Sequence, residues 1–198
     1  MRINNEKIIS SYKYFTGIDT GIKGGMVTLD EKGNIVLWNN MPKNEKGQVC
    51  EFGILDILKN FPKASTLVAY EKCQFNRFNQ KKEVAWYFGR NYQKVVSTLK
   101  LVGVHRIGIT PVTWKSEFGL IKKSKLVSVS TAIQLYPNKK EIFKHLAKNG
   151  SNKWIINDGV AEAAIIAMYL KRWSQSGLTN KTKGATKLVI KKGREQLD

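Results

Sequence analysis

One stretch of the sequence indicates the fold: Phe15-Thr16-Gly17-Ile18-Asp19-Thr20-Gly21-Ile22-Lys23-Gly24-Gly25. Its apolar first half predicts a short strand that ends at the carboxylate of Asp19. The glycines that follow leave little side-chain bulk beyond that carboxylate, which suits a site that admits phosphate or a metal ion. The alternative is a tight turn in which the aspartate only accepts hydrogen bonds from backbone amides. Taken alone, this stretch leaves both interpretations open.

The segments around this turn predict an antiparallel meander of three strands. Apolar runs over residues 14–19, 26–30 and 35–38 are separated by short connections, the first of which is the glycine turn. The spacing of the next apolar residues predicts a helix over 49–60 that ends before Pro62.

A second segment, Thr66-Leu67-Val68-Ala69-Tyr70-Glu71, again predicts a strand that ends in a carboxylate. Its nearly continuous apolar run is typical of a strand covered on both faces. If this strand pairs with the first one, Glu71 lies close to Asp19, and the two acids repel each other unless a cation lies between them. Lys72 could supply that charge, but a divalent cation does so better. We therefore favour a metal site.

Two further acids lie at the start of the last expected helix, over residues 158–173. Asp158 and Glu162 are four residues apart and hence on one face of this otherwise apolar helix. Asp158 alone would be explained by the helix dipole. Glu162 has mostly apolar neighbours, and an uncompensated buried carboxylate is costly. We therefore favour a functional role for the pair.

The intervening chain predicts a helix over 83–101, a strand over 104–110, a turn or short helix over 112–115 and a helix over 125–135. Residues 138–153 are polar and rich in lysine, with one short helical turn near Phe143, and we expect them to form an exposed, mobile insertion. The whole chain then divides into a polar leader (1–13), one α/β domain (14–173) and a basic, flexible tail (174–198).

The charge of the chain indicates a polyanionic partner. Its 198 residues carry 34 Lys and Arg against 15 Asp and Glu, a net charge of +19 that disfavours the compact state unless it is neutralised. Nucleic acid is the first candidate partner, and an anionic membrane surface is the second. The alternative is a general bias towards lysine in the source proteome, which requires no partner. We expect no small-molecule substrate.

Other features of the composition exclude several classes of protein. Two cysteines and two histidines cannot build a disulfide framework or a four-cysteine zinc site. No apolar run approaches the ~18 residues of a membrane span, and the first residues lack the apolar core of a signal peptide. We expect a reducing, cytosol-like compartment.

The loop over residues 72–82 combines cations, amides and aromatics without periodicity. We expect Arg77, Lys81 and Lys82 to contact DNA phosphates while Phe75 or Phe78 stacks on bases. The alternative is a solvated loop whose aromatic side chains fold back on the core.

Four motifs in this order resemble the RuvC-like Holliday junction resolvases of the RNase H-like superfamily, and the resemblance covers roughly 14–173. The motifs are Gly17-Ile-Asp-Thr-Gly21 with Gly24-Gly25, Tyr70-Glu71, Pro111-Val-Thr-Trp-Lys115 and Asn157-Asp-Gly-Val-Ala-Glu-Ala163. The chain is most similar to phage-type members and to the plant chloroplast resolvase, whose last helix also carries Asp-x-x-x-Glu-Ala. It departs from bacterial RuvC, in which the last two acids are three residues apart.

The resemblance implies an α/β fold with a mixed five-stranded sheet, three antiparallel strands followed by two parallel ones, and helices on both faces. It implies that Asp19, Glu71, Asp158 and Glu162 form a catalytic tetrad that binds two Mg²⁺ ions, for which Mn²⁺ can substitute. The activity implied is that of a crossover junction endodeoxyribonuclease, which cuts a four-way DNA junction symmetrically and leaves 5′-phosphate and 3′-hydroxyl ends.

The same resemblance assigns further roles. Lys115 and Lys123 correspond to lysines near the scissile phosphate, with solvated surface lysines as the alternative. Phe75, or else Phe78, corresponds to an aromatic residue near the junction centre. The family acts as a homodimer, and the helix over 83–101 is the candidate interface or, alternatively, a simple core helix.

Two other functions stay open at this point. The first is a non-catalytic RNase H-like module that binds nucleic acid through its positive charge, although an idle cluster of four acids would add only repulsion. The second takes Asp19-Thr20-Gly21 as a phosphate loop of the actin and sugar-kinase type. That fold needs two such domains, which 198 residues do not provide.

Overall fold

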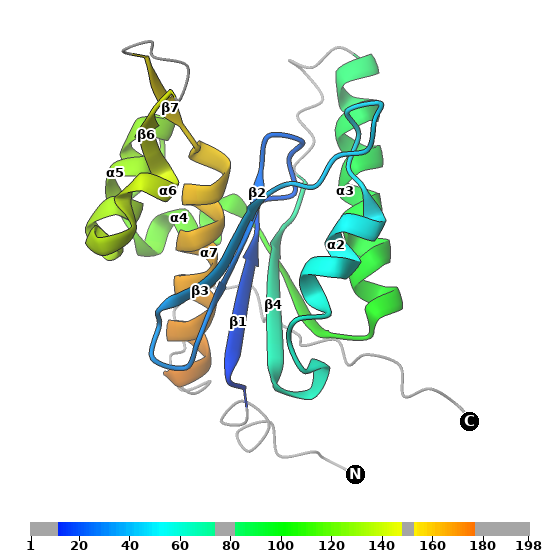
Figure 1. Ribbon diagram of the computed structural model, residues 1–198, viewed down its shortest axis with the longest axis horizontal. Helices are drawn as coiled ribbons and strands as arrows, with labels where there is room; N and C mark the ends of the chain where they lie inside the picture. The colour runs from blue at the N-terminus through cyan, green and yellow to red at the C-terminus, as the bar shows by residue number, and fades with distance from the viewer. Residues whose placement is uncertain (1–11, 74–81, 148–152, 177–198) are drawn as a thin grey trace.

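The centre of the fold is a mixed sheet of five strands (Figure 1). The computed structural model describes residues 12–73, 82–147 and 153–176. The strands lie in the order β3-β2-β1-β4-β5, with β1–β2 and β2–β3 antiparallel and β1–β4 and β4–β5 parallel. This confirms the predicted sheet. The strands are β1 (Tyr14–Ile18), β2 (Gly25–Leu29), β3 (Ile35–Asn40), β4 (Thr66–Glu71) and β5 (His105–Ile109).

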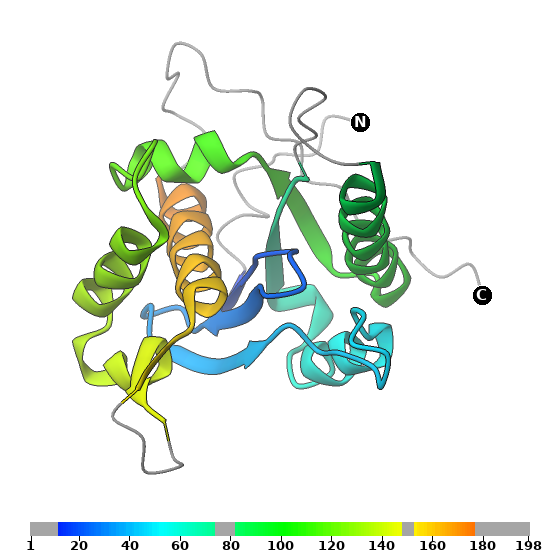
Figure 2. The ribbon, with the colours of Figure 1, turned by 90° about the horizontal axis from the view of Figure 1, so that it is seen from above.

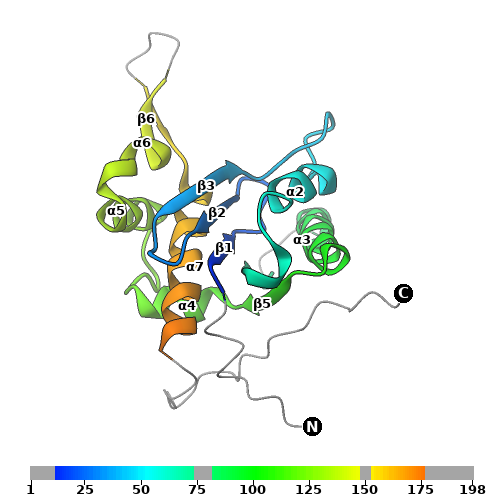
Figure 3. The ribbon, with the colours of Figure 1, turned by 60° about the horizontal axis from the view of Figure 1, so that its bottom comes forward.

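Helices cover both faces of this sheet, as expected, and Figures 2 and 3 show the two layers. One face carries α2 (Glu51–Leu58) and α3 (Lys82–Val102). The other carries α7 (Asp158–Gln175), against which α4 (Pro111–Glu117) and α5 (Lys125–Leu135) pack. The remaining elements are short: η1 (Lys63–Ser65), η2 (Pro137–Lys139), α6 (Lys140–Phe143), and the pair β6 (Lys144–Leu146) and β7 (Trp154–Ile156). None of the helices in the described ranges has the length and apolar character to cross a membrane.

Alternation along the strands separates two cores. Phe15 of β1, Leu67 of β4 and Ile107 of β5 lie in the core on the α7 side, whereas Ile18 and Val68 lie in the core with α2 and α3. Successive residues of a strand point to opposite faces, so the odd-numbered residues of β1 and β4 face α7. The same alternation directs Asp19 and Glu71, at the ends of these strands, to the α7 face.

The backbone of α7 lies directly on β1 and the adjoining turn. A Cβ atom at Gly17 would lie 2.2 Å from the carbonyl oxygen of Ala163, and one at Gly159 would lie 2.1 Å from that of Lys23. Alanines fill most of the helix face in between, and all are fully buried. Only residues without a Cβ fit at these two positions, so this contact determines how closely α7 approaches the sheet.

Two segments depart from the expected organisation. Residues 138–153 were expected to be an exposed insertion, but Ile142 and Phe143 are buried beside Tyr136, so the first part of this segment belongs to the core. The strand pair β6–β7 was not predicted. Tyr12, expected in the polar leader, is also buried, and its hydroxyl lies 2.6 Å from Nδ1 of His105. Residues 1–11 of the leader and 177–198 of the tail lie outside the described residues.

The contact between α7 and β1 can be tested with two glycine substitutions. We expect Gly17→Ala to lower the free energy of unfolding by about 3 kcal/mol or more, because the methyl group must displace helix backbone. The control is Gly89→Ala, since a Cβ there meets nothing within 4 Å. That change is expected to raise stability by about 0.5–1 kcal/mol. Urea unfolding measures both, and equal stability of the two variants would contradict the packing described.

Candidate active site

Two of the four predicted acids lie at the carboxyl ends of neighbouring parallel strands. Asp19 directly follows β1, and Glu71 is the last residue of β4. The register pairs Ile18 with Tyr70, so the two acids are in equivalent positions one residue further on. The hydroxyl of Thr20 donates a hydrogen bond of 3.0 Å to the carbonyl oxygen of Glu71, which ties the glycine turn to the end of β4.

The other two acids reach the same place from α7. A bridge between the backbones of Gly24 and Gly159 holds the first turn of α7 against the glycine turn. Asp158 is the first residue of the helix, and Glu162 lies about one turn further along, with only 6% of its surface exposed. Asp19 is coupled electrostatically to both, and Glu71 is coupled to Glu162 as well as to Asp19. The structure therefore brings the four predicted acids together at one end of the sheet.

Burial and mutual repulsion change the titration of the strand-end acids. Burial raises the pKa of Asp19 to about 6, and repulsion from Glu162 and Asp158 adds to this. The amide of Gly21, which donates to Oδ1 of Asp19 at 3.0 Å, opposes the increase. Burial likewise raises the pKa of Glu71 to about 7, with repulsion from Asp19 and Glu162. Both carboxylates would be stabilised by more positive charge in the site.

Two lysines supply part of that charge by pairing with the acids of α7. Nζ of Lys115 lies 3.3 Å from Oε1 of Glu162, which also accepts a hydrogen bond of 3.2 Å from the hydroxyl of Ser128. Nζ of Lys125 bonds Oδ2 of Asp158, and this bond raises the pKa of Lys125. Each acid of α7 thus has its own ammonium partner.

Glu71 has a neutral partner instead. Nε1 of Trp114 donates a hydrogen bond of 2.8 Å to Oε2 of Glu71, and the indole is fully buried. The bond fixes one carboxylate oxygen and opposes the increase in the pKa of Glu71. Trp114 stands next to Lys115 on α4, so this short helix supplies a partner to Glu71 and another to Glu162.

The donor set suits a hard divalent cation. Carboxylate oxygens are the ligands that Mg²⁺ and Mn²⁺ prefer, and two of the four have pKa values raised by burial and repulsion. With the side chains as they stand, no three Asp, Glu, His or Cys residues within the described part of the chain are arranged around one metal position. In this arrangement each acid of α7 is paired with an ammonium group, Glu162 with Lys115 and Asp158 with Lys125.

The predicted DNA-contact residues differ in where the structure places them. Lys115 lies in the site, paired with Glu162. Lys123 is exposed, and Lys82 is exposed at the start of α3. Phe75, Arg77, Phe78 and Lys81 lie outside the described residues.

Sequence reasoning missed three partners of the acids: Trp114, Lys125 and Ser128. The sequence could have indicated Trp114, because this residue belongs to the same motif as Lys115. It indicated Lys125 and Ser128 more weakly, through their position in the first turn of the helix that follows Ser124.

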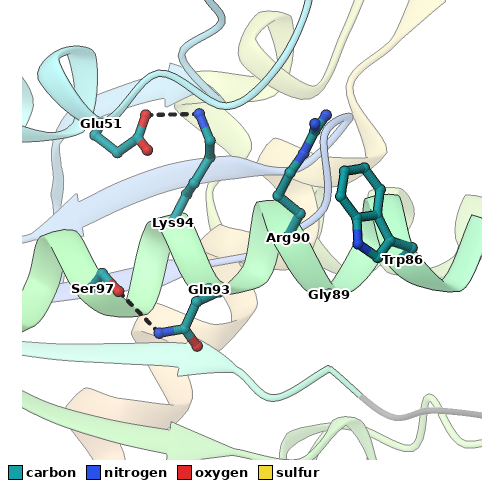
Figure 4. Close-up of a pocket in the computed structure, with 7 residues that line it drawn as sticks. All are labelled: Glu51, Trp86, Gly89, Arg90, Gln93, Lys94 and Ser97. Atoms are coloured by element: carbon teal, nitrogen blue, oxygen red, sulfur yellow. Dashed lines mark hydrogen bonds and ion pairs between the residues drawn. The ribbon is translucent and has the colours of Figure 1, made fainter.

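A surface hollow of about 540 Å³ lies elsewhere, on the face of the sheet that carries α2 and α3 (Figure 4). Lys94 pairs there with Glu51 at 3.0 Å, and Gln93 donates to Ser97. None of the four acids lines this hollow. Its lining residues are Glu51, Trp86, Gly89, Arg90, Gln93, Lys94 and Ser97.

Two solved structures from Thermus thermophilus are similar to this fold. One is RuvC in complex with Holliday junction substrate, with a TM-score of 0.52 and 18% identity over 82% of this chain and 94% of that one. The other is a RuvC structure with a TM-score of 0.53 and 18% identity over 82% and 95% of the two chains. The fold is therefore RuvC-like, as expected. No protein-family profile and no curated protein sequence matches the chain, and a closer relation to phage or plant resolvases stays a prediction.

The raised pKa values predict an unusual pH dependence of stability without metal. Asp19 and Glu71 have folded-state pKa values of about 6 and about 7, above their ordinary 3.8 and 4.5. Their contribution to stability is therefore fully present below about pH 4 and is lost as the pH rises towards 7. We expect the variant with Asp19→Asn and Glu71→Gln to gain stability over the wild type across this window.

Urea unfolding in EDTA between about pH 4 and about pH 8 measures the difference in free energy of unfolding between this double variant and the wild type. The difference should increase with pH and become constant above about pH 7. A difference that is independent of pH, or that decreases, would contradict the site described here.

Proposed function

We propose that the protein is a metal-dependent nuclease that resolves four-way DNA junctions. The proposal rests chiefly on the convergence of Asp19, Glu71, Asp158 and Glu162, from two strand ends and one helix, in a chain with a net charge of +19. A cluster of carboxylates in so positive a protein suits a cation that joins carboxylates to phosphate. The RuvC-like fold and the junction complex of one similar structure support this choice of substrate.

The four acids would hold the metal ions, Mg²⁺ or Mn²⁺. When bound, such ions would supply a water of lowered pKa and stabilise the leaving oxygen, and the hydrolysis that we propose would leave a 5′-phosphate and a 3′-hydroxyl. The protein contributes the position of its carboxylates. Gly21 holds one oxygen of Asp19, and Trp114 holds one oxygen of Glu71, so each acid is oriented by a single fixed hydrogen bond.

Lys115 and Lys125 have two successive roles in this proposal. Without metal, they balance the charge of Glu162 and Asp158. If these carboxylates held metal ions, the two ammonium groups would lose their present partners. Both then lie at the edge of the site, where a DNA phosphate is the nearest alternative anion. Lys125 is the more accessible candidate, because 67% of its side chain is exposed against 29% for Lys115.

A homodimer would place two such sites on one junction. The first half of α3 is the proposed interface, because it exposes three consecutive aromatic residues, Trp86, Tyr87 and Phe88. The guanidinium of Arg90 lies 4.7 Å from the ring centre of Trp86 and 5.0 Å from that of Tyr87. Such an aromatic cluster with an arginine is the composition that protein interfaces favour.

The function is tested by cleavage of labelled four-way junctions and linear duplexes with Mg²⁺. We expect paired nicks in the junction alone, and a loss of roughly 100-fold or more with Asp19→Asn, since even residues that only orient metal ligands contribute up to that much. Junction binding in the same variant should stay within a few-fold of the wild type. Binding without any cleavage by the wild type would favour a non-catalytic module, and equal cleavage of linear duplex would contradict junction selectivity.

Trp114 gives a second test, of a positioning residue. Trp114→Phe keeps an aromatic ring but removes the N–H that bonds Glu71. We expect a roughly 10–100-fold lower cleavage rate with unchanged junction affinity, because the carboxylate loses its orientation. The concentration of Mg²⁺ required for cleavage should increase. The pH profile of the cleavage rate should move to higher pH, because the bond from Trp114 lowers the pKa of Glu71 and its loss therefore raises that pKa. A purely structural role would reduce the melting temperature without moving that profile.

A further inference from the structure

The strand pair β6–β7 forms a small projection beyond α5 and α6, separate from the main sheet (Figures 1 and 2). Its register pairs Lys144 with Ile156 and Leu146 with Trp154. Its apolar side chains are largely in solvent: Leu146 is 49% exposed and Trp154 is 53% exposed, and Ile155 and Ile156 are each 39% exposed. An isolated pair of strands gains little stability from such side chains. Their exposure therefore indicates a contact surface.

Two hydrogen bonds hold the base of this projection beside Asp158. The backbone N–H of Asn157 donates to the carbonyl oxygen of Phe143 at 3.0 Å, and its side-chain amide donates to that of Ile142 at 2.8 Å. Both acceptors belong to buried residues of α6. Asn157 directly precedes Asp158, so the projection and the catalytic helix share one anchored residue. The base of β6–β7 therefore lies beside the acid end of α7.

The charges around the exposed tryptophan favour a polyanion. Residues 137–147 and 153–157 carry four lysines (139, 140, 144 and 153) against one acid, Glu141. Nζ of Lys144 lies 4.7 Å from the ring centre of Trp154. An aromatic face beside an ammonium group suits a nucleotide, whose base stacks on the ring while its phosphate meets the cation.

We infer that β6–β7 is a second DNA-contact element, in which Trp154 stacks on a base left unpaired or unstacked at the branch point while Lys144 and Lys153 contact the adjoining phosphates. The inference rests on the proposed function and extends it to the substrate arm beside α7. Stacking on an exposed base discriminates a branched substrate from a continuous duplex, whose bases stack on one another.

The test compares the affinity of full-length variants for a four-way junction and for a linear duplex, by fluorescence anisotropy with Ca²⁺ in place of Mg²⁺. Trp154→Ala is expected to bind the junction about 10-fold more weakly or worse, with a smaller effect on duplex. Lys144→Ala and Lys153→Ala should each reduce the slope of the logarithm of the binding constant against the logarithm of the salt concentration by about 1, because each removes one phosphate contact.

Two variants at other places serve as matched controls. Phe52→Ala removes an aromatic side chain that is 77% exposed on α2, on the opposite face of the sheet. Lys63→Ala removes a lysine in η1 just before β4, at the end of the sheet remote from Glu71. Both should bind like the wild type, and melting curves confirm that all variants are folded.

The outcomes separate this inference from the proposed function. A Trp154→Ala variant that binds and cuts junctions like the wild type would overturn the inference alone, as would one whose changed property is oligomeric state instead of DNA affinity. A wild-type protein that binds junctions but never cuts them would overturn the proposed nuclease function. The junction affinity of Trp154→Ala would then still decide the role of Trp154 in binding. Absence of DNA binding by the wild type would overturn both.

Discussion

The close contact between α7 and β1 is the constraint on which the rest of the structure depends. Gly17 and Gly159 carry no Cβ where the helix and the sheet meet, and the helix presents alanines in between. The resulting short separation brings a helix that starts with Asp158 against two strands that end at Asp19 and Glu71. With a larger residue at either glycine, the helix would move outward, and Glu162 would lose its place beside Glu71.

The same contact has an electrostatic cost. Four carboxylates at one end of the sheet repel one another, and burial raises the pKa values of Asp19 and Glu71. Lys115, Lys125 and Trp114 offset part of that cost through ion pairs and one hydrogen bond. In the metal-free protein, the ammonium groups of Lys115 and Lys125 balance part of the negative charge of the carboxylates. Only the two acids of α7 pair with lysines, whereas Asp19 accepts from the Gly21 amide and Glu71 from Trp114.

Much of this could be predicted from the sequence, because the decisive signals are local. Apolar runs that end in Asp19 and Glu71 define the strand ends, and an acid among alanines identifies Glu162. The resemblance assigned Lys123 to the scissile phosphate, but the lysine that pairs with an acid in this region is Lys125, which was not predicted. The turn just before α5, in which Lys122 adopts a φ of 59°, cannot be read from this run of lysines. The strands β6 and β7 were missed because each has only three residues, too few to show the alternation of apolar and polar residues that predicts a strand. The burial of Phe143 depends on tertiary packing that its lysine-rich surroundings do not reveal.

A crystal structure of the protein with Mn²⁺ measures the central claim most directly, through anomalous scattering from the metal. The account predicts anomalous peaks among the carboxylates of Asp19, Glu71, Asp158 and Glu162, with Lys115 and Lys125 displaced from their present acid partners. Bound metal elsewhere, or no metal at saturating Mn²⁺ with both lysine pairs intact, would contradict it.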